Sequence, residues 1–275
     1  MSGINTNLAS LNTQRNLSGS QMAVNQTVQR LSSGLRVNSA KDDSAGLAIA
    51  ERFNSQVKGM NVAIRNANDA VSLSQTAEGA LSKVSDMLQR MRELSVQSAN
   101  ATNSGSDRTN MDAEFQQLGK EITRTLSGTS FNGKAMLGAD AGTMTFQVGA
   151  GTTSNDSIDL VTTRLDTNST ITAVTGGNIT TAATATAAMT NLDAAIDKIT
   201  TERANYGAAQ NRFESAIGVL QVASENSAAS RSRIMDADYA VETAALSRAQ
   251  VLQQAGTAML AQANQMPNQV LTLLR

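Results

Sequence analysis

Apolar residues recur every three or four positions along most of the chain, which is the pattern of amphipathic helices. One such stripe runs from about residue 5 to residue 37, with an interruption near Gly34. A second stripe extends from about residue 42 to residue 100. At about 1.5 Å per residue, a helix of that length spans roughly 90 Å. Because no compact globule needs so long a helix, the pattern predicts an extended helical bundle.

The periodicity changes after the second stripe. Residues 101–106 are rich in Asn, Ser, Thr and Gly and predict a turn, after which Met111 to Leu126 define a shorter helix. Between about residues 131 and 164 apolar residues alternate with polar ones on both sides of the stretch AGTTSND, which predicts a small β-hairpin region. Residues 165–187 are dominated by Thr, Ala, Asn, Ser and Gly, so we expect a short variable surface loop there.

The longest regular stripe begins at residue 189 and continues to residue 266 in alternating steps of three and four. A heptad register held this long is typical of a left-handed coiled coil rather than of a single core helix. Polar residues dilute the stripe between residues 224 and 238, and Gly34 to Gly46 interrupt the N-terminal half. These interruptions predict a boundary between two bundles. In its last part the register places at the seam Val241, Ala245, Arg248, Leu252, Ala255, Met259, Gln262 and Met266.

These patterns predict a mainly α fold, a long antiparallel helical coiled-coil bundle with a small β-hairpin region. We expect residues 1–43 and 233–275 to form a terminal coiled-coil assembly domain. Residues 44–164 and 188–232 are expected to form a helical rod domain that carries the β-hairpin at about 131–164. The loop 165–187 completes the chain.

The two chain ends lack the means to fold alone. They carry few large apolar side chains for their length, and a hairpin of two helices leaves one face uncovered. We therefore expect them to be disordered in the monomer and to fold against neighbouring copies, which dispersed and protected terminal amides in an NMR spectrum of the monomer would contradict. Head-to-tail burial repeated without closure gives a helical filament. The predicted subunit-interface residues are Ile4, Leu8, Leu11, Val24, Val28, Leu31, Leu35, Leu252, Ala255, Met259, Met266, Val270, Leu273 and Leu274.

The composition favours long packed helices, and the charge distribution limits which partners the chain can bind. Twelve Met against five Phe, two Tyr and no Trp suit the narrow seams between helices, and the single proline, Pro267, leaves the rest of the chain free for long helices. The net charge of −1 comes from interspersed acidic and basic residues, so we expect no nucleic-acid partner. Neither a cleaved signal peptide nor a membrane span is expected, since no long apolar run occurs.

The sequence favours no enzyme class. It has no histidine and no cysteine, which removes the commonest general base and the usual zinc ligands, and we expect no catalytic residue, cofactor or metal. The Ser55-to-Lys58 spacing lacks the partner motifs of serine–lysine enzymes. The glycines around Ala150 lack the strand, helix and acidic residue of a dinucleotide site. Asp236 and Asp238 are two apart, so on a helix they point in different directions; capping or an intersubunit ion pair is expected instead.

Long stretches at both ends resemble bacterial flagellins. The N-terminal stretches are MSGINTNLASLNTQRNL and LSSGLRVNSAKDDSAGLAIAERF, and the C-terminal one is RSRIMDADYAVETAALSRAQVLQQAGTAMLAQANQMPNQVLTLLR. The resemblance implies the major subunit of the filament used for swimming motility, in a short form without large outer domains. It also implies that the terminal domain of residues 1–43 and 233–275 forms the inner tube of that filament. It further implies secretion as an unfolded chain through the flagellar type III export apparatus, and an extracellular location in the bacterial flagellum.

The resemblance also implies partners. A flagellar export chaperone would cover the C-terminal helix, a filament cap and hook-junction proteins would contact the assembled subunits, and the chain itself would form a homo-oligomer. A hook–filament junction protein is the nearest alternative, because it shares the N-terminal pattern. The ending VLTLLR favours the filament subunit. A secreted coiled-coil adhesin or effector is a more distant alternative.

A further implication concerns animal hosts. Flagellins similar to this chain are ligands of a cell-surface toll-like receptor through a patch written QRxRELxVQ, which matches residues 89–97. The residues carried over are Arg90, Leu94 and Gln97, spaced to share a helix face, with Glu114 on the next helix. Ser95 stands where the family often has Ala, which concerns potency. This face could also be buried between subunits. The segment similar to the one sensed by intracellular receptors comprises Val270, Leu273, Leu274 and Arg275.

Overall fold

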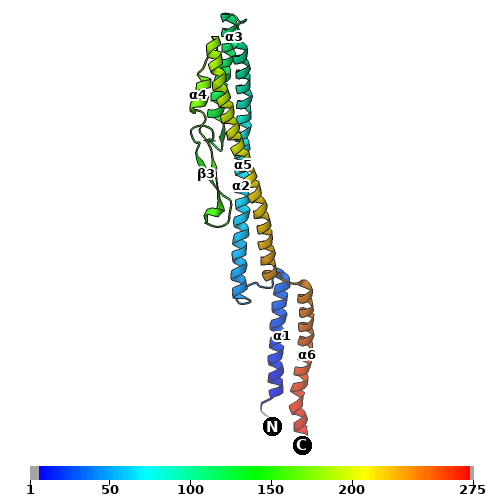
Figure 1. Ribbon diagram of the computed structural model, residues 1–275. Helices are drawn as coiled ribbons and strands as arrows, with labels where there is room; N and C mark the ends of the chain where they lie inside the picture. The colour runs from blue at the N-terminus through cyan, green and yellow to red at the C-terminus, as the bar shows by residue number, and fades with distance from the viewer. Residues whose placement is uncertain (1–5, 273–275) are drawn as a thin grey trace. The chain divides into compact units, whose positions relative to one another are not determined.

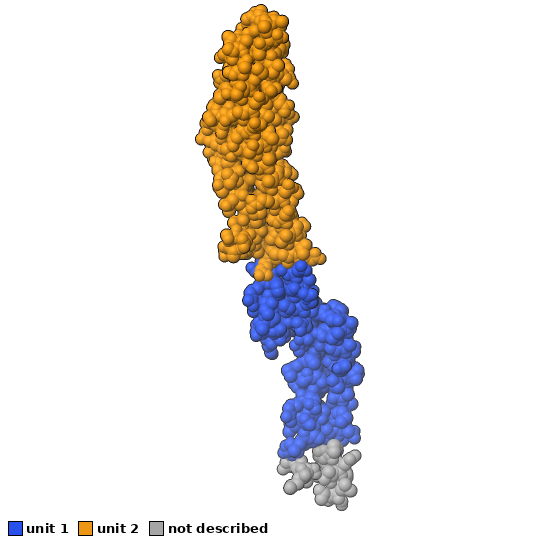
Figure 2. Space-filling view, in the orientation of Figure 1, with its two compact units in different colours: residues 1–55, 226–275 blue, residues 56–225 orange. Residues whose placement is uncertain are grey.

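The computed structural model describes residues 6–272, with side chains described for residues 6–265. The chain forms two compact units (Figures 1 and 2). Unit 1 comprises residues 1–55 and 226–275, and unit 2 comprises residues 56–225. The helices are α1 (Leu8–Ser33), α2 (Ser44–Ala99), α3 (Gly105–Gly128), α4 (Ser169–Thr175), α5 (Ala182–Met235) and α6 (Tyr239–Thr272), and the strands are β1 (Ser130–Phe131), β2 (Lys134–Ala135), β3 (Thr143–Gln147) and β4 (Ser157–Val161).

The mainly α prediction with a small hairpin region is confirmed. The first two expected helices end within a few residues of their predicted bounds, whereas α5 begins seven residues before the predicted start at residue 189. Local chemistry explains several of these ends. Gly34 ends α1 in the left-handed conformation at φ 70°, which glycine adopts without steric cost. Ser104 and Asp107 form a reciprocal capping box at the start of α3. The expected domain boundaries at residues 43/44 and 232/233 stay a prediction.

Unit 2 is built around the antiparallel packing of α2 and α5. Ion pairs join Arg92 to Asp193 at 2.6 Å and Glu78 to Arg203 at 2.8 Å, so rising numbers on one helix meet falling numbers on the other. On α5 the heptad register holds, because every seventh residue is fully buried. These residues are Leu192, Ile199, Tyr206 and Phe213.

The β-hairpin covers part of this core. Strands β3 and β4 pair antiparallel, with Thr143 opposite Val161 and Gln147 opposite Ser157. The alternation seen in the sequence turns one face inward, and the Phe146 ring meets the Phe213 ring edge-on with centroids 5.5 Å apart. The hairpin therefore belongs to the core of unit 2.

The expectation of a loop over residues 165–187 is wrong for most of that range. It contains α4 and the start of α5, and Ile171 and Val174 are buried. Helix α3 packs closely here, because a Cβ at Gly119 would lie 3.2 Å from the carbonyl oxygen of Thr175. The composition of this segment, mainly Thr and Ala, did not indicate a helix. Ile171 and Val174 are nevertheless enough to pack α4 against α3.

In unit 1, α1 and α6 run antiparallel. Hydrogen bonds join the segment that follows α1 to the segment that precedes α6. Leu35 and Asp236 form an antiparallel bridge, and the Arg36 guanidinium donates to the Ile234 carbonyl at 2.7 Å. Helix α6 starts afresh after a break at residues 236–238. The Asp238 carboxylate accepts from the Ala240 amide at 2.9 Å, so capping is confirmed for this residue.

Candidate assembly surface

Small and polar side chains make several contacts in the seam between α1 and α6, beside the half-buried Leu17, Leu31, Leu246 and Leu260. The Asn7 amide donates to the Ala263 carbonyl at 2.7 Å, and the Gln253 side chain donates to that of Gln21. A Cβ added at Gly256 would lie 3.2 Å from a methyl carbon of Leu17, so the helices approach closely there. Such a seam brings the two helices together while burying little apolar surface.

One ion pair stands out in this seam. The Arg30 guanidinium donates to the Glu242 carboxylate at 3.1 Å, and the Glu242 side chain is 10% exposed. Nearby, the Tyr239 hydroxyl donates to the Leu31 carbonyl at 3.2 Å. Polar contacts between specific partners define the register of a seam that apolar packing alone would leave loose.

Several large apolar side chains of these two helices are exposed instead of packed in the seam. Leu8 is 70% exposed and Leu252 is 54% exposed. Single exposed apolar residues are normal on a protein surface, but a series on one helix pair marks a surface that a partner covers. We call these residues the outer apolar set: Leu8, Leu11, Met22, Val28, Val241, Val251, Leu252 and Met259.

The stripe that periodicity selected on α6 is mostly not the one that packs against α1, because Ala245 is the only one of its members with a described side chain that is half-buried. Sequence periodicity placed Leu252, Ala255 and Met259 at the seam, and all three are exposed. The residues that face α1 are their neighbours. A helix can carry two adjacent heptad stripes, and the smaller side chains allow the closer approach of the two backbones. The residues buried or half-buried along α6 are Glu242, Ala245, Leu246, Ala249, Gln253, Gly256, Leu260 and Ala263.

The residues predicted for the subunit interface fall into three groups. Val24, Leu31 and Leu35 are half-buried within unit 1. Leu8, Leu11, Val28, Leu252, Ala255 and Met259 are exposed, as a surface that awaits a neighbour requires. Sequence reasoning missed Met22 and Val251, because they lie off the stripe that it followed, and it placed Val241 on that stripe without assigning it to the subunit interface. Ile4, Leu273 and Leu274 lie outside the described residues, as do the side chains of Met266 and Val270.

The residues of the 89–97 patch do not all face solvent. Arg90 and Gln97 are exposed, and Arg90 pairs with Glu114 at 2.8 Å. The hydrogen bonds that the Arg90 guanidinium donates to Glu114 and to Glu93 raise the pKa of Arg90. Leu94 is 2% exposed and belongs to the core of unit 2, so its assignment as a receptor contact is wrong for this chain as folded. Leu94 is turned about 40° from Arg90 around the helix axis, toward the core.

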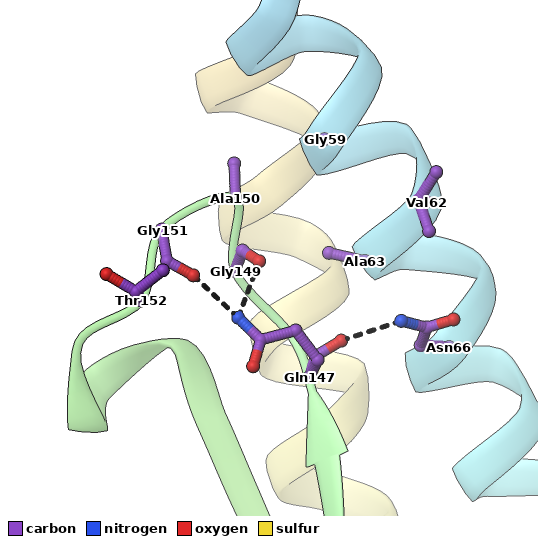
Figure 3. A pocket seen from close by; sticks show the side chains of 9 residues that line it. All are labelled: Gly59, Val62, Ala63, Asn66, Gln147, Gly149, Ala150, Gly151 and Thr152. Atoms are coloured by element: carbon purple, nitrogen blue, oxygen red, sulfur yellow. Dashed lines mark hydrogen bonds between the residues drawn. The ribbon is translucent and has the colours of Figure 1, made fainter.

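The Gly149-Ala-Gly151 segment is a packed loop (Figure 3). The Gln147 amide donates to the carbonyl oxygens of Gly149 at 3.1 Å and Gly151 at 2.8 Å, while Asn66 of α2 donates to the Gln147 carbonyl at 3.0 Å. A Cβ at Gly59 would come within 2.8 Å of the Ala150 methyl. The space that these residues line is a shallow gap between loop and helix, as the loop interpretation predicts.

The buried ionisable groups of unit 2 serve packing. Glu202 is 2% exposed and pairs with the Lys198 ammonium at 2.7 Å. Burial, reinforced by the nearby Glu202, raises the pKa of Tyr206. Among the described residues no cluster of three acidic side chains could hold a metal ion. Within the same range, no helix is long and apolar enough to cross a membrane.

Comparison with known proteins identifies both ends of the chain. Residues 4–142 match the family described as "Bacterial flagellin N-terminal helical region", and residues 189–274 match "Bacterial flagellin C-terminal helical region". A flagellin of Halalkalibacterium halodurans is 44% identical over 272 residues, covering 99% of each chain. Polar flagellin F of Vibrio parahaemolyticus is 36% identical over 372 aligned positions, covering 98% of this chain and 99% of the relative.

Solved structures agree with this. The crystal structure of Bacillus cereus flagellin is 35% identical, with a TM-score of 0.50, and the match covers 56% of this chain and 88% of that one. A putative flagellar hook-associated protein from Vibrio parahaemolyticus has a TM-score of 0.59 over 71% of this chain and all of its own. Its identity is 14%, so the likeness concerns the fold alone.

Proposed function

Because this chain belongs to the bacterial flagellin family, a family of structural proteins, we propose that the outer apolar set is the surface through which its copies assemble. The chain is a structural subunit of the bacterial flagellar filament, which is extracellular. What this leaves open is which residues hold the filament together.

The single observation that carries the proposal is the distribution of side chains on α1 and α6. The contact within the chain contains small and polar residues and leaves its leucines only half-buried, while Leu8, Met22, Leu252 and Met259 are each more than half exposed. Fully burying a leucine or methionine side chain stabilises a protein by about 1.5–3 kcal/mol. Most of the apolar burial that these helices can achieve is thus reserved for contact with other subunits.

Substituting two residues of the outer apolar set tests the proposal. We expect Leu8→Ser combined with Leu252→Ser to raise the subunit concentration needed to sustain filaments by about tenfold or more, because about 1.4 kcal/mol corresponds to each factor of ten. Both side chains are exposed in the subunit, so its own fold should be unchanged. Sedimentation of seeded or salted-out protein, with negative-stain electron microscopy of the pellet, measures the effect.

The matched control is Asn12→Ser combined with Gln250→Ser, which changes exposed polar residues on the same two helices. This variant should form long, uniform helical filaments at the concentration that the unchanged chain requires. Equal impairment of both variants, or none in either, would show that the outer apolar residues have no special part in assembly.

The remaining partners belong to the same proposal. An export chaperone would cover the apolar residues of α6 while the subunit waits for secretion through the flagellar type III apparatus. Cap and hook-junction proteins would meet the terminal helices at the two ends of the filament. We favour the filament subunit over a hook–filament junction protein, because flagellins match over nearly the whole chain at up to 44% identity, whereas the hook-associated protein shares 14%.

Recognition by a host toll-like receptor is a second proposed function. Arg90, Gln97 and Glu114 are exposed in unit 2, and the Arg90–Glu114 pair presents a fixed guanidinium. We expect Arg90→Ala to weaken receptor activation about tenfold, since arginine anchors commonly contribute at least about 1.4 kcal/mol to an interface. A receptor-reporter cell assay measures it. Lys83→Ala, at an exposed cation on the same helix, is the control; equal responses to both variants would exclude a specific role of Arg90.

A further inference from the structure

The methionines divide sharply by exposure. The chain has twelve, and Met1 and Met266 lie outside the residues with described side chains, which leaves ten. Eight of these ten are buried or half-buried: Met60, Met87, Met91, Met111, Met136, Met144, Met189 and Met235. The other two, Met22 and Met259, are 65% and 62% exposed. Both exposed methionines thus lie on α1 and α6 of unit 1.

Each of these methionines continues a stripe of the outer apolar set. Met22 lies two heptads after Leu8, and Met259 lies one heptad after Leu252, so each shares a helix face with an exposed leucine. A thioether packs much as a leucine does, but its sulfur can accept an oxygen atom, which a leucine cannot. Among the ten methionines with described side chains, the two most open to an oxidant therefore lie where assembly is proposed to cover them.

We propose that Met22 and Met259 form an oxidation site that controls assembly, an inference that rests on the assembly function proposed above. The co-reactant is a peroxide. A lone pair of the thioether sulfur attacks one peroxide oxygen, the O–O bond breaks and a sulfur–oxygen bond forms. With hydrogen peroxide the sulfur loses two electrons, the peroxide gains them, and one molecule of water leaves.

The product is a subunit with two polar sulfoxides on its apolar assembly surface. A sulfoxide oxygen is a hydrogen-bond acceptor that loses its water when a neighbouring subunit covers it, and nothing in an apolar contact replaces that water. The oxidised subunit therefore stays out of the filament. Methionine sulfoxide reductases reverse the reaction, so the block is not permanent.

The test uses the full chain and hydrogen peroxide. Free subunits are treated until peptide mass spectrometry shows sulfoxide at both positions, the peroxide is removed, and seeded assembly is measured. We expect the concentration needed to sustain filaments to rise about tenfold or more, corresponding to about 1.4 kcal/mol per subunit. For the Met22→Leu and Met259→Leu double variant, which retains the other methionines, peroxide treatment should leave the required concentration at that variant's own untreated value, because leucine has no sulfur to oxidise.

Unchanged assembly of the doubly oxidised chain would overturn the inference, as would equal loss in the oxidised leucine variant, which would place the effect at another methionine. Untreated chain run in parallel keeps the assembly function separate, because its filaments should form in either case. A second measurement needs no variant. Sulfoxide formation at Met22 and Met259 should be at least about tenfold slower in preformed filaments than in free subunits, and equal rates would refute the proposal.

Discussion

Deleting residues 236–275 is expected to abolish filament formation and to leave unit 2 folded. The deletion removes α6, which carries half of the outer apolar set and packs along α1. Unit 2 keeps its own core, which is made by residues between 67 and 213. Deleting residues 1–40 should have the same effect, because either helix alone presents an unpaired seam.

Two measurements check this expectation. Electron microscopy after seeding should show no filaments of either truncated chain, and mixing with intact chain should not draw the truncated one into the pellet. Circular dichroism should still show a helical protein that melts cooperatively, because unit 2 contains most of α2 and α5 and all of α3. Filaments formed by a truncated chain would contradict the assignment of assembly to the terminal helices.

Replacing Phe213 by Ala is expected to destabilise unit 2 by about 3–5 kcal/mol, the usual loss when a buried aromatic ring leaves a cavity. Phe213 is fully buried on α5, and its ring meets Phe146 of β3 edge-on. The substitution therefore removes contacts that hold the hairpin to the helices. Urea denaturation followed by circular dichroism measures the free energy of unfolding.

Val219→Ala is the matched control for this substitution. Val219 lies on the same helix six residues further on and is 70% exposed, so its loss should change the free energy of unfolding by no more than about 0.5 kcal/mol. A similar loss for both variants would mean that the packing of Phe146 and Phe213 contributes little, and that unit 2 is stabilised by helix formation in general.

The positions of the long helices follow from the sequence because the rules that govern them are local. Apolar residues at three- and four-residue steps, a single proline and a left-handed Gly34 specify where helices run and where α1 ends. The hairpin at β3 and β4 follows from alternation in the same way. The absence of histidine and cysteine from the sequence is enough to exclude the commonest general base and the usual zinc ligands. The long stretches at both ends identify the family.

Three features needed the tertiary structure, because each depends on what lies opposite a residue. Helix α4 forms because Ile171 and Val174 find α3 to pack against. Leu94 belongs to the core although its neighbours in the motif are exposed, since a turn of about 40° around the helix axis moves it from solvent to a packed face.

The third feature concerns the assembly surface itself. Periodicity specifies the spacing of the residues in a stripe, but not which side of the helix faces a neighbour. The sequence by itself therefore determined that α6 carries a heptad pattern. It did not determine which residues of α6 contact α1. Only the folded chain placed the small residues, such as Ala249 and Gly256, inside and the large ones, such as Leu252 and Met259, outside. The physical reason is size, because backbones approach most closely where side chains are small, and large apolar groups then remain for another subunit to cover.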